Sequence, residues 1–513
     1  MIRSFLTVSS GTLASRLLGF LRDSMIAALL GTGAVADAFL VAFQLVNVAR
    51  RLLSEGALNA ALVPAWLRLR DTEGAAAAAS FAGRVLGTIS AALIALTVLI
   101  GLLMPLFITL LAPGFAGRES LPLAASYARL MLPYLAFAGP ATVLLALASA
   151  QGRFFLAAFS PLLFNIALIA VMIALVIVPQ EAGLVARVLA ATVGIAGLLQ
   201  LSILVLRRGE RVATPLRVSF DAEMRGFLAR AIPGMVASSA PQLLIVAGAI
   251  IASSAPSAVS WLYFANRLIE LPLGIVGVAM GMVLIPELTR ALRGGDKSVI
   301  AAAESRALEL AVGLALPAML GLIALSTPIV RLLFEHGAFT AADTQSTSRA
   351  LVWLALGLPA HVLVKALSPT FFAREDTTAP LVATLKALVV TIVLAVLLGH
   401  FFGASGIAAG IACGAWTNAL SLIRRGRTTF GFSPDAATRR RLPRIAAAAF
   451  VMGGLLWLAS LALGDATHTL AQAVILLALI GAGIAAYGLL LAGFGVAGWR
   501  ELVDALRRPH QAI

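Results

Sequence analysis

Apolar runs of about 20 residues, separated by short polar breaks, follow one another along the whole chain. A helix needs about 20 apolar residues to cross the hydrocarbon core of a bilayer, so the pattern predicts an all-α polytopic membrane protein with about fourteen transmembrane helices. The expected spans are 7–30, 35–66, 82–110, 127–150, 157–178, 186–206, 228–252, 258–288, 303–328, 347–372, 379–399, 401–422, 445–464 and 469–496. The second and eighth are unusually long, and we expect bends at Gly56 and Pro272.

Composition excludes a soluble protein. Of the 513 residues, 61% are hydrophobic and only 12% are charged, and the mean hydropathy is +1.00. So few polar groups could not cover the apolar surface of a soluble chain of this length.

The net charge of +15 is explained by orientation in the membrane. Lys and Arg gather in the loops 207–217, 290–297 and 424–444 and in the tail 500–508, which all lie on one side if the number of spans is even. Basic residues mark the cytoplasmic side, so both termini are expected there. This placement gives no reason to expect a nucleic-acid partner.

An internal repeat divides the chain. "LVPAWLRLRDTEGAAAAAS" at 62–80 resembles "LIPELTRALRGGDKSVIAA" at 284–302, and "LLAPGF" at 110–115 parallels "LFEHGAF" at 333–339. The offset of about 220 residues holds six spans, and an even number makes the repeats parallel. We therefore expect two six-helix lobes, 1–222 and 223–430, around a central cavity. Residues 431–513 would add two extra helices and a basic cytoplasmic tail.

Charged residues within the expected spans are the candidate functional residues. Each costs at least about 2.5–3.5 kcal/mol near mid-bilayer, so a group of them should face water or one another. Helical spacing aligns Arg51 with Glu55, Arg16 with Asp23 and Arg267 with Glu270. Arginine is suited to bidentate phosphate binding, so the set predicts an anionic, phosphate-bearing substrate. The candidates are Arg16, Arg22, Asp23, Asp37, Arg50, Arg51, Glu55, Arg267 and Glu270.

Two alternatives remain open at this point. The charges could form internal salt bridges, Arg51 with Glu55 and Arg267 with Glu270, that serve folding. An enzyme is the other class, but the five histidines lack metal-ligand spacing and no GxxxxGK[ST] phosphate loop occurs. The sequence therefore predicts a transporter rather than an enzyme.

The same residues carry a family resemblance. The segments are "SRLLGFLRD", "ADAFLVAFQLVNVARRLLSEGALNAALVP", "FANRLIELPLGIVGVAMGMVLIPEL", "HGAFTAADT" and "ALSPTFFAREDTTAP". In this order they resemble the MurJ (MviN) lipid II flippases of the MOP superfamily. The resemblance implies transport of undecaprenyl-pyrophosphate-linked peptidoglycan precursor from the inner to the outer leaflet of the bacterial cytoplasmic membrane. It also implies alternating access, central-cavity roles for the candidate charges and a groove for the lipid tail on the last two helices.

The resemblance leaves energy coupling and competing functions open. Some relatives bind sodium, but the acidic residues in spans seven, nine, eleven and twelve are Glu304 and Glu309, near a span end. No cofactor is assigned, and the membrane potential or a monovalent cation could drive transport. The expected partners are lipid II, membrane lipids and the cell wall synthesis machinery, with the protein a monomer. The alternatives are a cation-coupled multidrug exporter, an exporter of another lipid-linked oligosaccharide, and a membrane glycosyltransferase or ligase.

Overall fold

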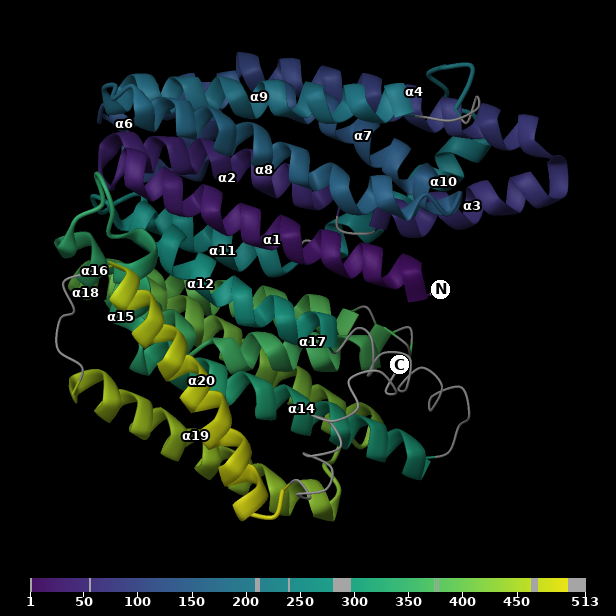
Figure 1. Ribbon diagram of the computed structural model, residues 1–513. Helices are drawn as coiled ribbons and strands as arrows, with labels where there is room; N and C mark the ends of the chain where they lie inside the picture. The colour runs from purple at the N-terminus through teal and green to yellow at the C-terminus, as the bar shows by residue number, and fades with distance from the viewer. Residues whose placement is uncertain are drawn as a thin grey trace. The chain divides into compact units, whose positions relative to one another are not determined.

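The computed structural model describes residues 2–54, 57–207, 213–238, 240–279, 297–372, 374, 376, 378–462 and 469–496. In these residues the regular structure is helical, with one 3₁₀ turn and no β-strand. Two compact units form: the first contains Met1–Ser260 and His336–Thr340, and the second contains Trp261–Glu335 and Ala341–Ile513. Figure 1 traces the helices of each unit.

The helices of the first unit are α1 (Ile2–Leu30), α2 (Ala34–Ser54), α3 (Ala57–Glu73), α4 (Ala75–Leu102), α5 (Met104–Leu111), η1 (Pro113–Phe115), α6 (Ser120–Met131), α7 (Pro133–Ala150), α8 (Phe154–Ile177), α9 (Ala182–Arg207), α10 (Ala222–Ser238) and α11 (Ala240–Ala252). Helix α12 (Ala258–Ala279) leads into the second unit. There follow α14 (Lys297–Ala324), α15 (Ser326–Phe334), α16 (Ala341–Ala355), α17 (Leu358–Phe372), α18 (Thr378–Phe430), α19 (Ala436–Ala462) and α20 (Thr469–Gly493).

The all-α membrane architecture is confirmed. Each of the fourteen expected spans overlaps at least one helix, and eight described helices are long and apolar enough to cross a membrane. The spans 379–399 and 401–422 both lie in α18, which is interrupted by non-helical backbone at Gly403, with φ 56° and ψ −136°. Glycine tolerates this positive φ because it has no Cβ, so the turn between the two spans falls there.

Of the two positions where the sequence predicts a bend, the structure describes only Pro272. Gly56 lies outside the described residues, between the end of α2 at Ser54 and the start of α3 at Ala57. Pro272 lies inside α12, and the helix continues on both sides of it. Proline removes one backbone hydrogen bond from a helix, but it did not end this one.

Helix boundaries recur along the chain. Helix α4 begins at Ala75 and α14 begins at Lys297; α5 begins at Met104 and α15 begins at Ser326. Both pairs are separated by about 220 residues, the offset of the sequence repeat. The compact first unit extends to Ser260, beyond the repeat boundary predicted at 222/223, because α10 and α11 pack on helices of the first unit. The division into six-helix lobes stays a prediction.

Close backbone packing fixes the end of α1. The amide of Ala338 donates to the carbonyl oxygen of Ala28 (2.8 Å). A Cβ at Gly31, where φ is +61°, would lie 2.5 Å from the Ala338 oxygen, and a Cβ at Gly337 would lie 2.3 Å from the Ala28 oxygen. Any side chain at these glycines would push the segment 336–340 away from α1.

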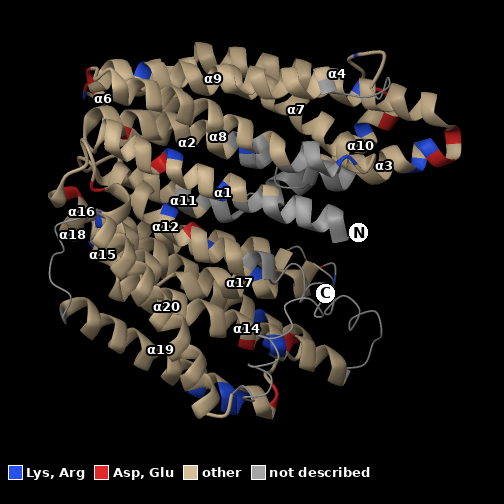
Figure 2. Ribbon diagram, viewed as in Figure 1, with Lys and Arg blue, Asp and Glu red and all other residues tan. Residues whose placement is uncertain are grey.

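Within the first unit, α1 packs along α8, α8 packs on α9, and α2 packs on α6 and α7. In the second unit α14 packs on α17 and α19, and α19 packs on α20. In Figure 2 the middles of α19 and α20 carry no charged residue. Large apolar side chains such as Trp457, Leu470 and Leu477 are exposed on these two helices (54%, 83% and 68%), as expected for a surface covered by lipid.

Candidate substrate-binding site

A buried ion pair on α1 is the centre of the candidate site. The Nε and Nη2 atoms of Arg22 both donate to Oδ1 of Asp23, at 2.8 and 2.6 Å. Arg22 is 4% exposed and Asp23 is completely buried. Two charge-assisted hydrogen bonds that converge on one carboxylate oxygen hold the guanidinium group in place. Asp23 therefore orients Arg22 and balances its charge.

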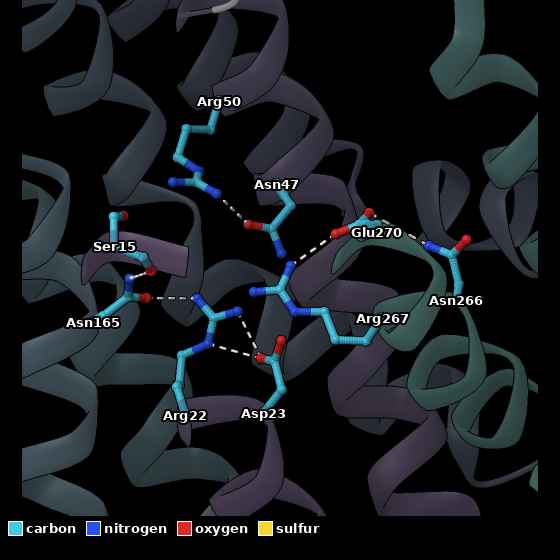
Figure 3. A network of polar contacts seen from close by, with 9 residues as sticks. All are labelled: Ser15, Arg22, Asp23, Asn47, Arg50, Asn165, Asn266, Arg267 and Glu270. Carbon is cyan, nitrogen blue, oxygen red and sulfur yellow. Dashed lines mark hydrogen bonds and ion pairs between the residues drawn. The ribbon is translucent and has the colours of Figure 1, made fainter. Parts of the chain in front are cut away.

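Asn165 on α8 accepts a further hydrogen bond from Arg22. Its Oδ1 atom accepts a hydrogen bond from Nη1 of Arg22 (3.0 Å), and its Nδ2 atom donates to the carbonyl oxygen of Ser15 (3.2 Å). Figure 3 shows this network. Sequence reasoning missed Asn165, although an amide in the apolar run 154–177 was a signal, because a buried amide needs hydrogen-bond partners.

Aromatic rings lie close to the guanidinium groups of Arg22 and Arg50. The Cζ atom of Arg22 lies 4.9 Å from the ring centre of Phe43 and 5.8 Å from that of Phe164. The Cζ atom of Arg50 lies 5.6 Å from the ring centre of Phe164. Phe43 and Phe164 are stacked at 6.4 Å, and the edge of Tyr134 packs on Phe164 at 5.2 Å. The ring of Phe164 thus lies near two guanidinium groups, which the negative face of an aromatic ring attracts.

Two other candidate arginines of the first unit, Arg16 and Arg50, are more accessible than Arg22. Arg50 on α2 is half-buried and donates from Nη2 to Oδ1 of Asn47 at 3.4 Å, a long hydrogen bond. Arg16 on α1 is exposed and makes no hydrogen bond or ion pair with any described residue. Although seven residues separate Arg16 and Asp23, the structure does not bring them together.

Arg267 and Glu270 form an ion pair in the second unit. The distance from Nη1 to Oε2 is 2.8 Å, and the two side chains are 20% and 22% exposed. Asn266 donates to the other carboxylate oxygen of Glu270 at 3.4 Å. The internal salt bridge that the sequence left open is therefore formed in this structure, on a partly exposed helix face.

Asp37 lies in a different environment from the arginines it was grouped with. It is 3% exposed and accepts hydrogen bonds from the amide (2.9 Å) and the hydroxyl of Ser260, at the start of α12. This carboxylate is engaged in helix packing in the present state. The side chain of Arg51 and all of Glu55 lie outside the described residues.

Carboxylates elsewhere in the second unit are engaged by cations and hydroxyls. Glu304 pairs with Arg374 at 3.0 Å. Glu309 accepts from Thr438 (2.7 Å) and lies 3.4 Å from Arg441. Among the described residues, no group of three or more His, Cys, Asp or Glu could hold a metal ion.

Comparison of the sequence with known proteins shows the family of this chain. The family model described as lipid II flippase MurJ matches residues 26–476. The chain belongs to the MurJ family. A "Probable lipid II flippase MurJ" of Rhizobium meliloti is 37% identical, over 100% of this chain and 97% of the relative. A lipid II flippase MurJ of Burkholderia cenocepacia is 31% identical, over 89% of each chain.

Solved structures give the same fold for this MurJ family member. A lipid II flippase MurJ in an inward closed conformation matches with a TM-score of 0.79 at 23% identity, covering 97% of this chain and 100% of that one. An inward-facing multidrug resistance MATE transporter of the MOP superfamily matches with a TM-score of 0.66 at 18% identity, covering 84% and 96%. The MurJ and MATE folds are therefore related, and the helical framework does not distinguish their substrates.

Proposed function

We infer that this protein is a lipid II flippase, which moves the peptidoglycan precursor across the cytoplasmic membrane for cell wall synthesis. Membership of the MurJ family carries the inference. The site chemistry agrees with it, because lipid II bears a pyrophosphate and the first unit contains an arginine network on α1, α2 and α8. A cation-coupled drug exporter would instead need a pocket in which carboxylates or aromatic rings predominate.

The arginines have different roles in this proposal. Arg22 is held by Asp23 and Asn165, so its direction is set before the substrate arrives. Arg16 is exposed and Arg50 is half-buried, so they are available to make the first contacts with the headgroup. Preorganised charge lowers the ordering cost of binding, and exposed charge raises the rate of encounter. Arg267 and Glu270 contribute from the second unit, as the family resemblance implies.

Transport would follow alternating access, with the two repeats rocking around the bound headgroup while the polyprenyl tail stays in lipid. The uncharged faces of α19 and α20 suit such a tail. Both termini would lie in the cytoplasm, and the membrane potential or a monovalent cation would supply the energy. The protein would act as a monomer beside the cell wall synthesis machinery.

The decisive experiment is depletion of the protein in growing cells. Lipid II should become inaccessible to a reagent added from outside while its total amount rises, and the wild-type gene should restore access. An Arg22→Ala variant present at wild-type level should fail to restore it. Unchanged access after depletion would refute the proposed function.

A further inference from the structure

Arg129 on α6 is an arginine inside a membrane-spanning stretch that the substrate network does not use. Helices α6 and α7 together form one apolar stretch, Ser120–Ala150, long enough to cross the bilayer. Arg129 lies nine residues after its start, about 13 Å along the helix axis. The apolar pattern of the sequence predicts a span that begins at residue 127, which places Arg129 at its edge. The helix begins earlier, so the charge lies deeper within it.

The side chain of Arg129 has no partner among the described residues. It is exposed, and it makes no hydrogen bond or ion pair in the described part of the chain. Arg22 and Arg267, by contrast, both pair with carboxylates. An arginine within the hydrocarbon region is costly unless water or an anion compensates its charge.

Arg129 borders a surface pocket between α5 and α6 of about 450 Å³. Most of the lining is apolar and comes from Pro105, Leu121, Pro122, Ala125 and Leu130, whereas Ser126 and Arg129 supply the polar groups. Ser126 precedes Arg129 by three residues, so both side chains lie on the same face of α6. The lining contains no carboxylate that could neutralise the arginine.

The pocket lies among side chains that suit a lipid environment. On α5, Leu106 and Leu110 are 55% and 63% exposed, and Leu102, at the end of α4, is 74% exposed. A ligand that occupies this pocket must therefore be apolar along most of its length and anionic at one point. Those are the properties of a phospholipid.

We propose that the pocket between α5 and α6 binds one anionic phospholipid, whose phosphate contacts Arg129 and Ser126 and whose acyl chain lies against Pro105, Leu121 and Leu130. The bound lipid neutralises a charge that would otherwise face hydrocarbon. It also fills the space between two helices of the first unit. The site is separate from the lipid II network on α1, α2 and α8, so the proposal does not rest on the proposed function.

The test measures retention of phosphatidylglycerol by the purified protein in mild detergent, using native mass spectrometry. Arg129→Gln removes the charge but keeps a polar side chain of similar length. Arg187→Gln is the matched control, because Arg187 is exposed on α9 and does not line the pocket. A charge-assisted contact contributes enough that the affinity of Arg129→Gln should fall about tenfold or more. Arg187→Gln should keep wild-type affinity.

Additional measurements identify the chemical class of the ligand. Diacylglycerol, which has the chains but no phosphate, should not be retained, and inorganic phosphate should not displace phosphatidylglycerol. Arg129→Lys should bind with intermediate affinity because it keeps the charge without the bidentate fork. Melting temperatures establish that each variant is folded, and Ser126→Ala provides a milder change if Arg129→Gln is not.

Equal retention by wild type and Arg129→Gln would overturn the proposal. Retention of diacylglycerol to the same degree would reduce the site to an apolar crevice, and displacement by inorganic phosphate would make it a site for free anions. Either result would also refute it.

Discussion

The sequence repeat predicts that the two halves of the chain share a helical framework, and positions about 220 residues apart carry different chemistry. About 220 residues after Arg22 stands Leu244, which is buried at 2% exposure, and about 220 residues after Asn165 stands Ala387, which is fully buried. Where the first half has a buried arginine and a buried amide, these two positions carry buried apolar side chains.

The apolar residues at these later positions raise the question of what the polar network of Arg22, Asp23 and Asn165 contributes. Taking two charges out of water costs several kcal/mol per ion, and a well-packed apolar replacement is often as stable or more stable. We propose that Arg22, Asp23 and Asn165 serve substrate binding rather than folding.

The largest expected effect on stability and binding comes from replacing Arg22 and Asp23 by Leu and Ile, the residues that stand about 220 positions later in the sequence. The double variant Arg22→Leu/Asp23→Ile should melt near or above the wild-type temperature, because both charges leave together. Arg22→Leu alone should be destabilised by about 3–5 kcal/mol, because Asp23 stays buried without its partner. Both variants should lose lipid II binding. Melting and binding measurements on purified protein check this, and an unfolded double variant would contradict it.

Replacing Asn165 by the alanine of the second half should have the next largest effect. Arg22 Nη1 would lose its buried acceptor, at a cost of about 1–3 kcal/mol, and lipid II affinity should fall about tenfold as the guanidinium reorients. The matched control is Asn418→Ala on α18, a buried amide that bonds Thr384 at 3.4 Å. The control should lower the melting temperature without changing affinity. Equal affinity losses in the two variants would show that Asn165 acts only through folding.

Phe164→Leu tests how much the aromatic ring beside Arg22 and Arg50 contributes to binding. The change keeps an apolar side chain but removes the ring that contacts Arg22 and Arg50, each contact being worth about 0.5–2 kcal/mol. Lipid II affinity should fall several-fold. Phe81→Leu is the control, because Phe81 is buried in the same unit and packs edge-on against Phe227 at 5.9 Å. If both variants bind lipid II equally, the ring serves packing alone.

The smallest effect concerns a helix cap in the second unit. The amide of Thr438 donates to Asp435 at the start of α19 (2.6 Å), and this bond holds the pKa of Asp435 below its ordinary value of 3.8. A lowered pKa stabilises the fold above pH 3.8, and the contribution disappears as the pH falls through the folded pKa. Asp435→Ala should therefore melt slightly below wild type at pH 7, and the difference should shrink in acid. A constant difference across melting curves from pH 7 to pH 3 would count against the cap.

The amino-acid sequence by itself determined the membrane class, the positions of the spans and the residues that carry intramembrane charge. These follow from local properties: about 20 apolar residues cross a bilayer whatever surrounds them, and a charge in such a run is costly in any fold. The pairing of Arg267 with Glu270 was also accessible, because three residues separate them on one helix turn.

Only the tertiary structure decided which charges are buried and what they contact. Helical spacing aligned Arg16 with Asp23, yet in the folded chain Asp23 is buried and Arg16 is exposed. Asn165 reaches Arg22 across 143 positions of the chain, and Ser260 reaches Asp37 across 223. Periodicity describes one helix at a time, whereas a buried polar group is satisfied by whichever helix packs against it. For that reason the sequence identified the charged residues, but the packing of α8 and α12 assigned their partners.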